Sequence, residues 1–526
     1  MKKNIFVISI ICFTFTGLSY ADKWQIVGAR AMGMGGVGVA TAYGSDAQYW
    51  NPANLAEIKD YDSNIVLNIA AGIEATEKVL TVVDKLSDMA DKYKDLTDKI
   101  NSGSAANAEE VSTIFEGLSA ISDLNFQNIG AIVDANAGLG TKIKKLAISV
   151  RTFVNSGITP IVDTQNIGLG IGSDPSNPSL GIDLGDTTDP ISTENKNSAD
   201  LIAATIQNTG VTDSLAALLG LPSGTTAQQI GNSLVNMAAN IPGATEEQIA
   251  KMAEIIETEL PKAENLIKLA GTGSYEDNKT QVLIDAGLFT ELSIGYGYEV
   301  LKGLQVGANL KAIKGQMAQT GIMILDDKQN IGDAIDKALK DTTNSTQFGI
   351  DLGVMVDFER FFNHEIILNP KVGITARNIN SPQFDRPDKP LDAGYEDLQW
   401  NTEKYDMGKQ VRAGLAINPI DDLILACDVD VLANETFVKN FESQDLAVGL
   451  EYPIINKRAF SLPIRLGVNK NIANVNSHLA YTAGIGLYTF GFSLELAGAM
   501  SSQITTLDGT KVPASASCAL SVGYLF

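Results

Sequence analysis

The final thirteen residues of the chain, 514-ASASCALSVGYLF-526, indicate the fold because they carry the sharpest periodicity in the sequence. Apolar residues occupy alternate positions there, namely Ala516, Cys518, Leu520, Val522, Tyr524 and Phe526. Side chains of a strand alternate between its two faces, so this segment predicts a strand with one apolar face and one small or polar face. A strand with lipid outside and a crowded lumen inside needs that arrangement, although an edge strand of a soluble sheet would show it too.

The aromatic terminus favours the membrane interpretation. Leu520, Val522, Tyr524 and Phe526 resemble the C-terminal signature by which the barrel assembly machinery recognises proteins for insertion into the outer membrane. The same alternation recurs upstream, and it predicts 14 strands, an even number as in bacterial single-chain barrels. The predicted strands are residues 63–73, 129–140, 143–155, 281–300, 303–315, 345–357, 366–378, 408–418, 422–433, 443–452, 460–469, 478–488, 489–500 and 514–526.

The lengths of the connections support the same interpretation. Those after the second, fourth, eighth and twelfth predicted strands are tight turns, and those after the sixth and tenth are short. Those after the first, third, fifth and seventh are long. Barrels with both termini in the periplasm alternate short periplasmic turns with long external loops, whereas a soluble β-sandwich has no reason to sort its loops in this way. We therefore predict an all-β membrane protein, an antiparallel transmembrane β-barrel over residues 63–526.

The N-terminus predicts export. Lys2 and Lys3 precede an apolar stretch, and Ser19-Tyr20-Ala21 fits a small-x-small cleavage site. We expect residues 1–21 to be a signal peptide cleaved after Ala21, rather than a retained anchor, and the mature chain to lie in the outer membrane of a Gram-negative cell. No later apolar run reaches the roughly 18 residues of a spanning helix. The formal net charge of -23 disfavours nucleic acid as a partner.

Two long connections predict helical inserts, at residues 74–128 and 195–270. Within 76–100, apolar residues recur at alternating steps of four and three, which is an amphipathic helical stripe. In the second insert, Thr226 with Gln229 and Thr245 with Gln248 match the capping box that starts a helix. Such helices either pack on each other as an external cap or form a structure that binds a protein partner or gates the barrel.

The stretch that follows the signal peptide is rich in glycine. Residues 28–56 read GARAMGMGGVGVATAYGSDAQYWNPANLA. A nucleotide-binding loop is excluded, because no Lys-Ser or Lys-Thr follows the glycines and no βαβ unit surrounds them. Glycines let backbones cross closely and permit positive φ, and Pro52 fixes a bend after Asn51. Such devices suit a peptide that must satisfy its backbone groups inside a polar lumen.

This stretch resembles the N-terminal plug of the FadL-type outer-membrane β-barrel superfamily. The matching residues are Arg30, Met32, Gly33, Met34, Gly35, Gly36, Asp46, Asn51, Pro52, Ala53 and Leu55. Arg377 and Asn378, which close a predicted strand, resemble these proteins as well, and the long inserts are closest to the conjugal-transfer TraF-like branch. The resemblance implies a plug over residues 22–62. Its residues Arg30, Met32, Gly33, Met34, Gly35, Gly36, Asn51, Pro52 and Ala53 serve either to fold the plug or also to gate the lumen.

The resemblance implies a channel for hydrophobic small molecules. The alternative is a non-conducting scaffold linked to conjugal transfer or protein secretion, whose helical inserts bind a protein partner. A third interpretation is a soluble lumenal or periplasmic β-rich protein, which heat-modifiable gel migration of the membrane fraction would distinguish from a barrel. We expect no enzyme, no metal and no cofactor, because His364 and His478 are far apart in the sequence and no nucleophile motif accompanies either. Cys427 and Cys518 lie in strand-like runs as small apolar residues, and the sequence leaves a disulfide between them open.

Overall fold

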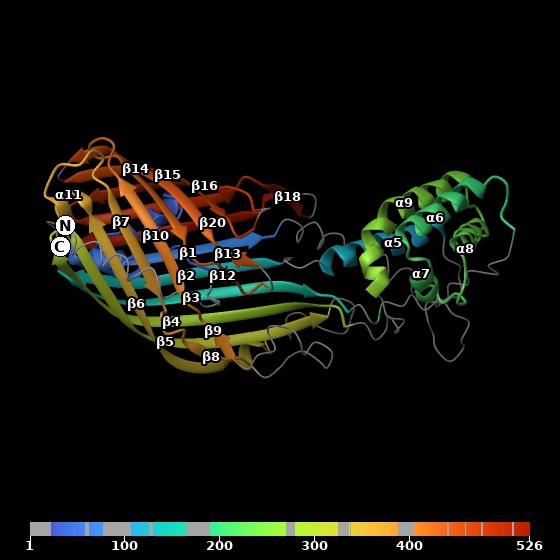
Figure 1. Ribbon diagram of the computed structural model, residues 1–526, viewed down its shortest axis with the longest axis horizontal. Helices are drawn as coiled ribbons and strands as arrows, with labels where there is room; N and C mark the ends of the chain where they lie inside the picture. The colour runs from blue at the N-terminus through green and yellow to red at the C-terminus, as the bar shows by residue number, and fades with distance from the viewer. Residues whose placement is uncertain are drawn as a thin grey trace, which may run out of the picture.

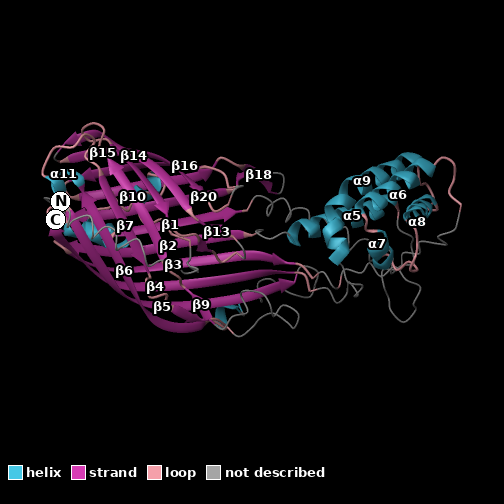
Figure 2. Ribbon diagram, in the orientation of Figure 1, coloured by secondary structure: helices cyan, strands magenta, loops and turns pink. Residues whose placement is uncertain are grey.

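The computed structural model is an elongated molecule with a β-barrel at one end and a helical bundle at the other (Figure 1; Figure 2). It describes residues 23–57, 63–76, 107–125, 130–163, 166, 190–269, 279–323, 336, 338–387 and 404–526, the last range less residues 439–440, 458, 475–476 and 508–509. The predicted signal peptide and most of the predicted helix over 76–100 lie outside the described residues.

Fourteen antiparallel strands form one closed barrel, and the predicted number of strands is confirmed. Each strand pairs with its neighbour along the chain, and β20 closes the ring on β1. The strands are β1 (Asn64–Ala75), β2 (Ala131–Ile143), β3 (Leu146–Ile161), β4 (Gln281–Leu301), β5 (Leu304–Met323), β6 (Thr343–Asp357), β7 (Lys371–Arg377), β10 (Gln410–Ile417), β11 (Ile424–Asp430), β14 (Asp445–Lys457), β15 (Phe460–Asn471), β16 (Ala480–Thr489), β17 (Phe492–Ser501) and β20 (Ser515–Leu525).

The connections sort by length as predicted. At the end of the barrel that we call the turn end, two residues join β2 to β3, β4 to β5 and β16 to β17. The short helix α11 (Phe358–Phe362) joins β6 to β7 at the same end. The opposite end, which we call the outer end, carries the long connections. Three of them contain two-stranded sheets: β8 (Gln383–Asp385) with β9 (Lys404–Asp406), β12 (Asn434–Glu435) with β13 (Glu442–Ser443), and β18 (Ile504–Leu507) with β19 (Thr510–Pro513).

Side chains alternate across the barrel wall. On β20, Val522, Tyr524 and the terminal Phe526 are 41–52% exposed on the outer face, whereas Ser521 on the inner face is buried. The same outer face of the barrel exposes Leu292, Ile294 and Tyr296 on β4. A continuous exposed apolar belt over a closed sheet is the surface that a lipid bilayer requires. No helix among the described residues is both long and apolar enough to cross a bilayer.

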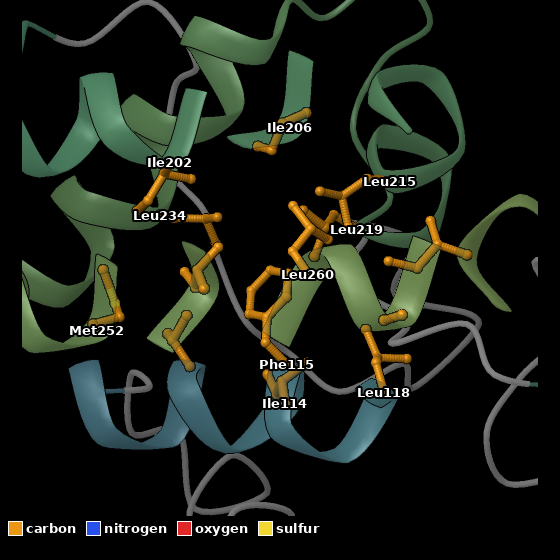
Figure 3. Packing of buried hydrophobic residues seen from close by; sticks show 14 of the residues in the cluster. Ile114, Phe115, Leu118, Ile202, Ile206, Leu215, Leu219, Leu234, Met252 and Leu260 are labelled. Carbon is orange, nitrogen blue, oxygen red and sulfur yellow. The ribbon is translucent and has the colours of Figure 1, made fainter. Parts of the chain in front are cut away.

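The two helical inserts form a single bundle. The first insert contributes α5 (Ala108–Asn125), and the second contributes α6 (Lys196–Thr209), α7 (Thr212–Leu218), α8 (Ala227–Ala239) and α9 (Glu246–Leu269). Phe115 of α5 packs with Leu260 of α9 and Leu215 of α7 in one buried apolar core (Figure 3). Thr226 and Gln229 form the predicted capping box at the start of α8, with both reciprocal hydrogen bonds present. The helices therefore bury their apolar stripes against each other.

Residues 23–57, which we call the N-terminal segment, lie inside the barrel (Figure 1). The segment contains α2 (Ala29–Gly33), η1 (Gly44–Asp46), α3 (Ala47–Trp50) and η2 (Pro52–Ala56). It starts in the outer half of the lumen, where Lys23 pairs with Glu74 near the outer end of β1. It ends near the turn end, where Ala56 lies against Gly297 of β4. The segment therefore crosses the lumen along its length before the chain enters β1.

Candidate functional site in the barrel lumen

Glycines on both sides let the N-terminal segment touch the wall with its backbone. A Cβ on Gly33 would come within 3.0 Å of the Gly484 Cα, and a Cβ on Gly449 would lie 2.2 Å from the Met34 carbonyl oxygen. Gly35 and Gly36 have φ angles of 79° and 94°, which an L side chain rarely adopts. The glycines predicted from the sequence thus serve close approach and a left-handed turn.

Met32 and Met34 are buried against the wall rather than facing open space. Met32 packs with Ala29, Ala70 and Ala519, and Met34 packs with small residues of β10, β11 and β14. Both side chains are at most 2% exposed. The two methionines fill gaps between the segment and the wall, a role to which their flexible side chains are suited.

Arg30 makes a two-point polar link between the segment and the wall. Its guanidinium binds the Glu451 carboxylate of β14 through two hydrogen bonds of 2.9 Å, from Nε and Nη2. Arg465 of β15 donates to the same carboxylate and also to Glu495 of β17 at 3.1 Å. Tyr488 donates to Glu495 as well. Paired charges and shared donors offset the cost of burying these groups in the lumen.

The motif Asn51-Pro52-Ala53 closes the segment against β5 and β6. The Asn51 side chain accepts from the Ala53 N–H at 3.1 Å and donates to the Val354 carbonyl oxygen at 3.0 Å. A Cβ on Gly307 of β5 would lie 2.1 Å from the Pro52 carbonyl carbon. Asn51 therefore satisfies backbone groups on both the segment and the wall, as its side-chain amide permits.

Asp428 holds the middle of the segment, and the sequence analysis did not single it out. Its Oδ2 accepts from the Gly38 N–H at 2.7 Å and from the Val39 N–H at 2.9 Å. Next along β11, Asp430 pairs with Arg412 of β10. The signal was available, because Asp428 and Asp430 alternate with apolar residues in the predicted strand 422–433 and must face inward if those face lipid.

An aromatic group occupies the centre of the lumen. Trp24, Tyr49 and Trp50 of the segment pack with Phe153 of β3. The Arg377 guanidinium lies 4.1 Å above the centre of the Tyr49 ring, within the range of a cation–π interaction. The structure thus places Arg377 against the segment. Its neighbour Asn378 accepts from Lys311 at 2.6 Å and donates its backbone N–H to Asp351 at 2.9 Å.

A second aromatic group lies in the outer half of the lumen, beneath the β8–β9 hairpin. Phe384 of β8 packs edge-on against Phe289 on the inner face of β4, with ring centres 5.1 Å apart. Tyr405 of β9 stacks on Phe289 at 5.5 Å. Arg386 anchors the hairpin to Asp285 through an ion pair of 2.6 Å. The hairpin therefore folds into the barrel and covers the inner face of β4 and β5.

The connection between β11 and β14 crosses the lumen, and we call its described residues 434–438 and 441–443 the strap. In the ring of 14 strands, β11 and β14 lie opposite β2 and β3. The strap reaches that far wall, where Phe437 lies against Gly157 of β3 and Val438 packs with Ile132 of β2. Phe437 also contacts Tyr405, with ring centres 5.1 Å apart. The strap and the β8–β9 hairpin thus share one apolar cluster.

A polar cavity of about 140 Å³ lies between the strap, the start of the N-terminal segment and β1, β15, β16, β17 and β20. Lys23 with Glu74 and Asp134 forms one side, and Asn471, His478 and Gln503 contribute to the outer side. Desolvation tends to lower the Lys23 pKa, but the neighbouring carboxylates outweigh it and raise the pKa, so this amine stays charged.

The wall is short on one side of the barrel. β7, β10 and β11 contain seven, eight and seven residues, whereas β4 and β5 contain 21 and 20. A strand needs about 9–11 residues to span the hydrocarbon core. Beyond the end of β7, the side chain of Asn380 binds backbone groups of β6 that a longer β7 would pair with. It donates to the Phe348 carbonyl oxygen at 2.7 Å and accepts from the Ile350 N–H at 3.0 Å.

Glycine in a strand can mark a bulge, which makes β4 near Gly295 and Gly297 a candidate for a wall gap, but the structure shows no gap there. β4 pairs with β5 at both positions and with β3 at Gly295, and the Gly297 N–H donates to the Lys145 carbonyl oxygen in the β2–β3 turn at 3.2 Å. A Cβ on Gly295 would lie 2.3 Å from Asn309 Oδ1, and one on Gly297 would lie 2.3 Å from the Ala56 backbone nitrogen. These glycines make room for polar luminal side chains and for the end of the segment.

Groups suited to other chemistry are scattered. Within the described ranges, no three His, Cys, Asp or Glu side chains are placed to hold a metal ion. Cys427 and Cys518 are both free thiols. His364 follows α11 at the turn end, and His478 lines the outer cavity. The predicted insertion residues Leu520, Val522, Tyr524 and Phe526 lie on the outer face of the last strand and at its end.

Comparison with known proteins places the chain in a family. No curated protein matches it. Among solved structures it is similar to the Ralstonia pickettii toluene transporter TbuX (10% identity, 95% of this chain and 98% of that chain, TM-score 0.39), to the CymD monoaromatic hydrocarbon channel (12%, 95% and 97%, 0.41) and to a Pseudomonas aeruginosa FadL homologue (9%, 96% and 100%, 0.38). The model of the family described as "F plasmid transfer operon, TraF, protein" matches residues 48–430, which is more than half of the chain. The chain therefore belongs to this TraF family.

Proposed function

We propose that the protein is an outer-membrane channel for small hydrophobic molecules, and that the N-terminal segment is its plug. One observation carries this proposal. The segment fills the lumen, yet it is fixed by separate side-chain links such as Arg30 with Glu451 and Asp428 with Gly38, and not by a β-ladder with the wall. A segment held in this way can move out of the lumen while every strand of the barrel keeps its hydrogen-bonded partners.

The lining supports a hydrophobic cargo. The outer aromatic group around Phe289 and the central group around Trp24 and Tyr49 place aromatic faces at two depths of the lumen. Flat apolar surfaces with few polar groups favour apolar ligands.

The low wall at β7, β10 and β11 offers a sideways exit. Asn380 closes the backbone there through side-chain hydrogen bonds, which can break without the loss of a strand. Phe348, next to this point, is 75% exposed on the outer face. A molecule that leaves the lumen beside Phe348 would enter the bilayer directly and would not have to cross the polar turn end.

A cysteine lock tests whether the segment must move. A Cβ on Gly140 of β2 would lie 3.1 Å from the Ser45 Cβ, so Ser45→Cys with Gly140→Cys can form a disulfide after a small adjustment. The native thiols Cys427 and Cys518 are replaced by serine in all variants. The matched control is Gly72→Cys with Ser517→Cys, which joins β1 to β20 at the same Cβ–Cβ distance of 3.1 Å without touching the segment.

The readout is uptake of radiolabelled naphthalene by cells whose outer membrane contains each variant. We expect the oxidised Ser45–Gly140 variant to lose uptake and to recover it on reduction, whereas the wall control transports in both states. Equal uptake by the locked and reduced segment would contradict a plug that moves.

The helical bundle favours a second candidate, a scaffold in the plasmid-transfer role that the family description names. Because α5 and α9 share one core, the bundle is a single body beyond the barrel mouth with a polar outer surface available to a protein. Removing residues 77–128 and 190–270 together avoids exposing half of that core. Loss of plasmid transfer with retained naphthalene uptake would support the scaffold, and the reverse result would support the channel.

A further inference from the structure

The strap presents apolar side chains to the far wall of the barrel. Phe437, Val438 and Phe441 are at most 5% exposed, although they belong to a connection at the outer end of a lumen. Val438 and Phe441 pack on Ile132 of β2, and Phe437 joins the cluster that contains Phe289 of β4. The strap therefore carries its own apolar anchor across the barrel.

The wall beneath Phe437, which we call the seat, is shaped for a flat ring. It consists of Gly157 of β3 with Gly287 and Phe289 of β4. A Cβ on Gly157 would lie 2.0 Å from the Phe437 carbonyl oxygen, and one on Gly287 would lie 3.1 Å from Phe437 Cζ. Gly157 thus makes room for the backbone of Phe437, and Gly287 beside Phe289 makes room for its ring.

The anchor contrasts with the polar base of the strap. The strands β12 and β13 pair over only two residues each, which is too little to hold a hairpin by itself. Asn434 at its base is 1% exposed, and among the described residues neither atom of its side-chain amide has a hydrogen-bond partner. A buried amide without a partner weakens the closed position relative to one in which Asn434 reaches water.

We propose that the strap is an internal competitor for a ligand site: Phe437 occupies the seat, and an uncharged aromatic molecule binds there when the strap lifts. This inference rests on the proposed channel function and adds a second closure to it, in the outer half of the lumen. Phe441 also lines the polar cavity on the other side of the strap. Lifting the strap therefore joins that cavity to the seat and opens a path from the outer end.

Two substitutions distinguish the effect of an empty seat from the effect of a displaced strap. Phe437→Ala removes the ring and leaves the seat empty. Gly157→Val displaces the strap, because its Cβ meets the Phe437 carbonyl, and at the same time fills the seat with its own methyl groups. Phe362→Ala is the control, since it removes a 61% exposed ring from α11 at the turn end.

The experiment measures naphthalene binding to the full chain in lipid nanodiscs by equilibrium dialysis, with empty nanodiscs subtracted. We expect Phe437→Ala to tighten binding about tenfold, because the competing closed state no longer occupies the seat. Phe362→Ala should bind like the unmodified chain. Gly157→Val should speed deuterium exchange in residues 434–443 without tightening naphthalene binding.

Two results would overturn the proposal. The first is binding by Phe437→Ala that is no tighter than that of the unmodified chain. The second is equal tightening by Gly157→Val, which would place naphthalene outside the seat. Because binding is measured without transport, neither result affects the plug, which the cysteine lock tests. Conversely, tighter binding by Phe437→Ala together with uptake through a locked segment would keep the ligand site and reject the plug.

Discussion

Arg30 of the N-terminal segment and Glu451 of β14 form a two-point ion pair, with both N–O distances at 2.9 Å and both side chains about one-eighth exposed. The two residues are separated by 421 positions in the chain, and the pair is one of several charged links between the segment and the wall. Glu451 is not dedicated to Arg30, because Arg465 of β15 binds the same carboxylate. If the segment leaves, Glu451 therefore keeps Arg465 as a partner, but Arg465 then serves both Glu451 and Glu495, and the cluster on the wall carries one unbalanced negative charge.

The shared carboxylate predicts an order of effects. Arg30→Gln removes the segment's link and leaves the Glu451–Arg465 pair intact, so we expect a cost of about 1.5–3 kcal/mol, confined to the seating of the segment. Glu451→Gln leaves Arg30 and Arg465 without this carboxylate and should cost about 3–5 kcal/mol.

Both variants should raise the open probability of single channels in planar bilayers, and Glu451→Gln should also lower the urea midpoint of barrel unfolding. The control is Lys404→Ala, which breaks an ion pair whose two side chains are 55% exposed. Equal urea midpoints for the two luminal variants would show that the carboxylate is not shared in solution.

Wall glycines predict a steric test of the closed lumen. Gly307→Ala places a methyl group 2.1 Å from the Pro52 carbonyl carbon, so the end of the segment has to shift. Gly498→Ala on β17 adds the same methyl group where the nearest atom is 3.6 Å away. We expect increased single-channel conductance for Gly307→Ala and unchanged conductance for Gly498→Ala. An unchanged single-channel conductance in both variants would mean that contact with Pro52 does not seal the channel.

Asp428 predicts a local effect that exchange can detect. Asp428→Ala leaves the Gly38 and Val39 amides without their acceptor, at about 1–3 kcal/mol for each buried donor. Deuterium exchange in the peptide that contains these amides should accelerate about fivefold or more, since roughly 1.4 kcal/mol corresponds to tenfold. Asp385→Ala, at a 55% exposed side chain in β8, is the matched control. An unchanged exchange rate would show that contacts other than those of Asp428 fix this part of the segment.

Local patterns were enough to predict the barrel. Alternation from Ala516 to Phe526 identified the closing strand, and sorting of the loops by length identified the end of the barrel that carries the long connections. Both signals arise from interactions that repeat along the chain, because every strand meets the same lipid and the same lumen. The predicted start of β7 at residue 366 was five residues early, since Leu368 and Asn369 adopt positive φ angles in the turn before Lys371.

The partners inside the lumen depend on the register of distant strands, which local patterns do not contain. The sequence indicated Arg30 and Asn51 but not Glu451 or Val354, their partners. Glycine often marks an irregular strand, so Gly295 was a candidate for a wall gap. The structure gives another reason for a glycine at this position, because the side chain of Asn309 on the neighbouring strand leaves no room for a Cβ. The strap was missed for the same reason, since its short strand β12 is followed, and its short strand β13 preceded, by an apolar anchor that lies on the opposite wall.

Asp46 makes the attachment of the N-terminal segment to the barrel wall sensitive to pH. Burial raises the pKa of this carboxyl to about 6, although the Arg151 guanidinium at 3.8 Å and the Asn68 amide at 2.7 Å act in the opposite direction. Glu495 adds a small further rise, and Arg30 a small fall. Because the folded pKa lies above the ordinary value of 3.8, the proton bound by Asp46 stabilises the seated segment. That contribution is complete below pH 3.8 and is lost as the pH rises through about 6.

We therefore expect the segment to be held more tightly at pH 5 than at pH 7.5. Deuterium exchange of residues 44–50, corrected for the intrinsic pH dependence of amide exchange, should be faster at pH 7.5. Asp46→Asn keeps the shape, removes the titration and should abolish this difference. Exchange in α9, whose exposed Glu264 and Lys268 lie far from Asp46, provides the internal control. Tighter protection at pH 7.5 than at pH 5 would contradict this account, because the sign follows from burial of the charged form.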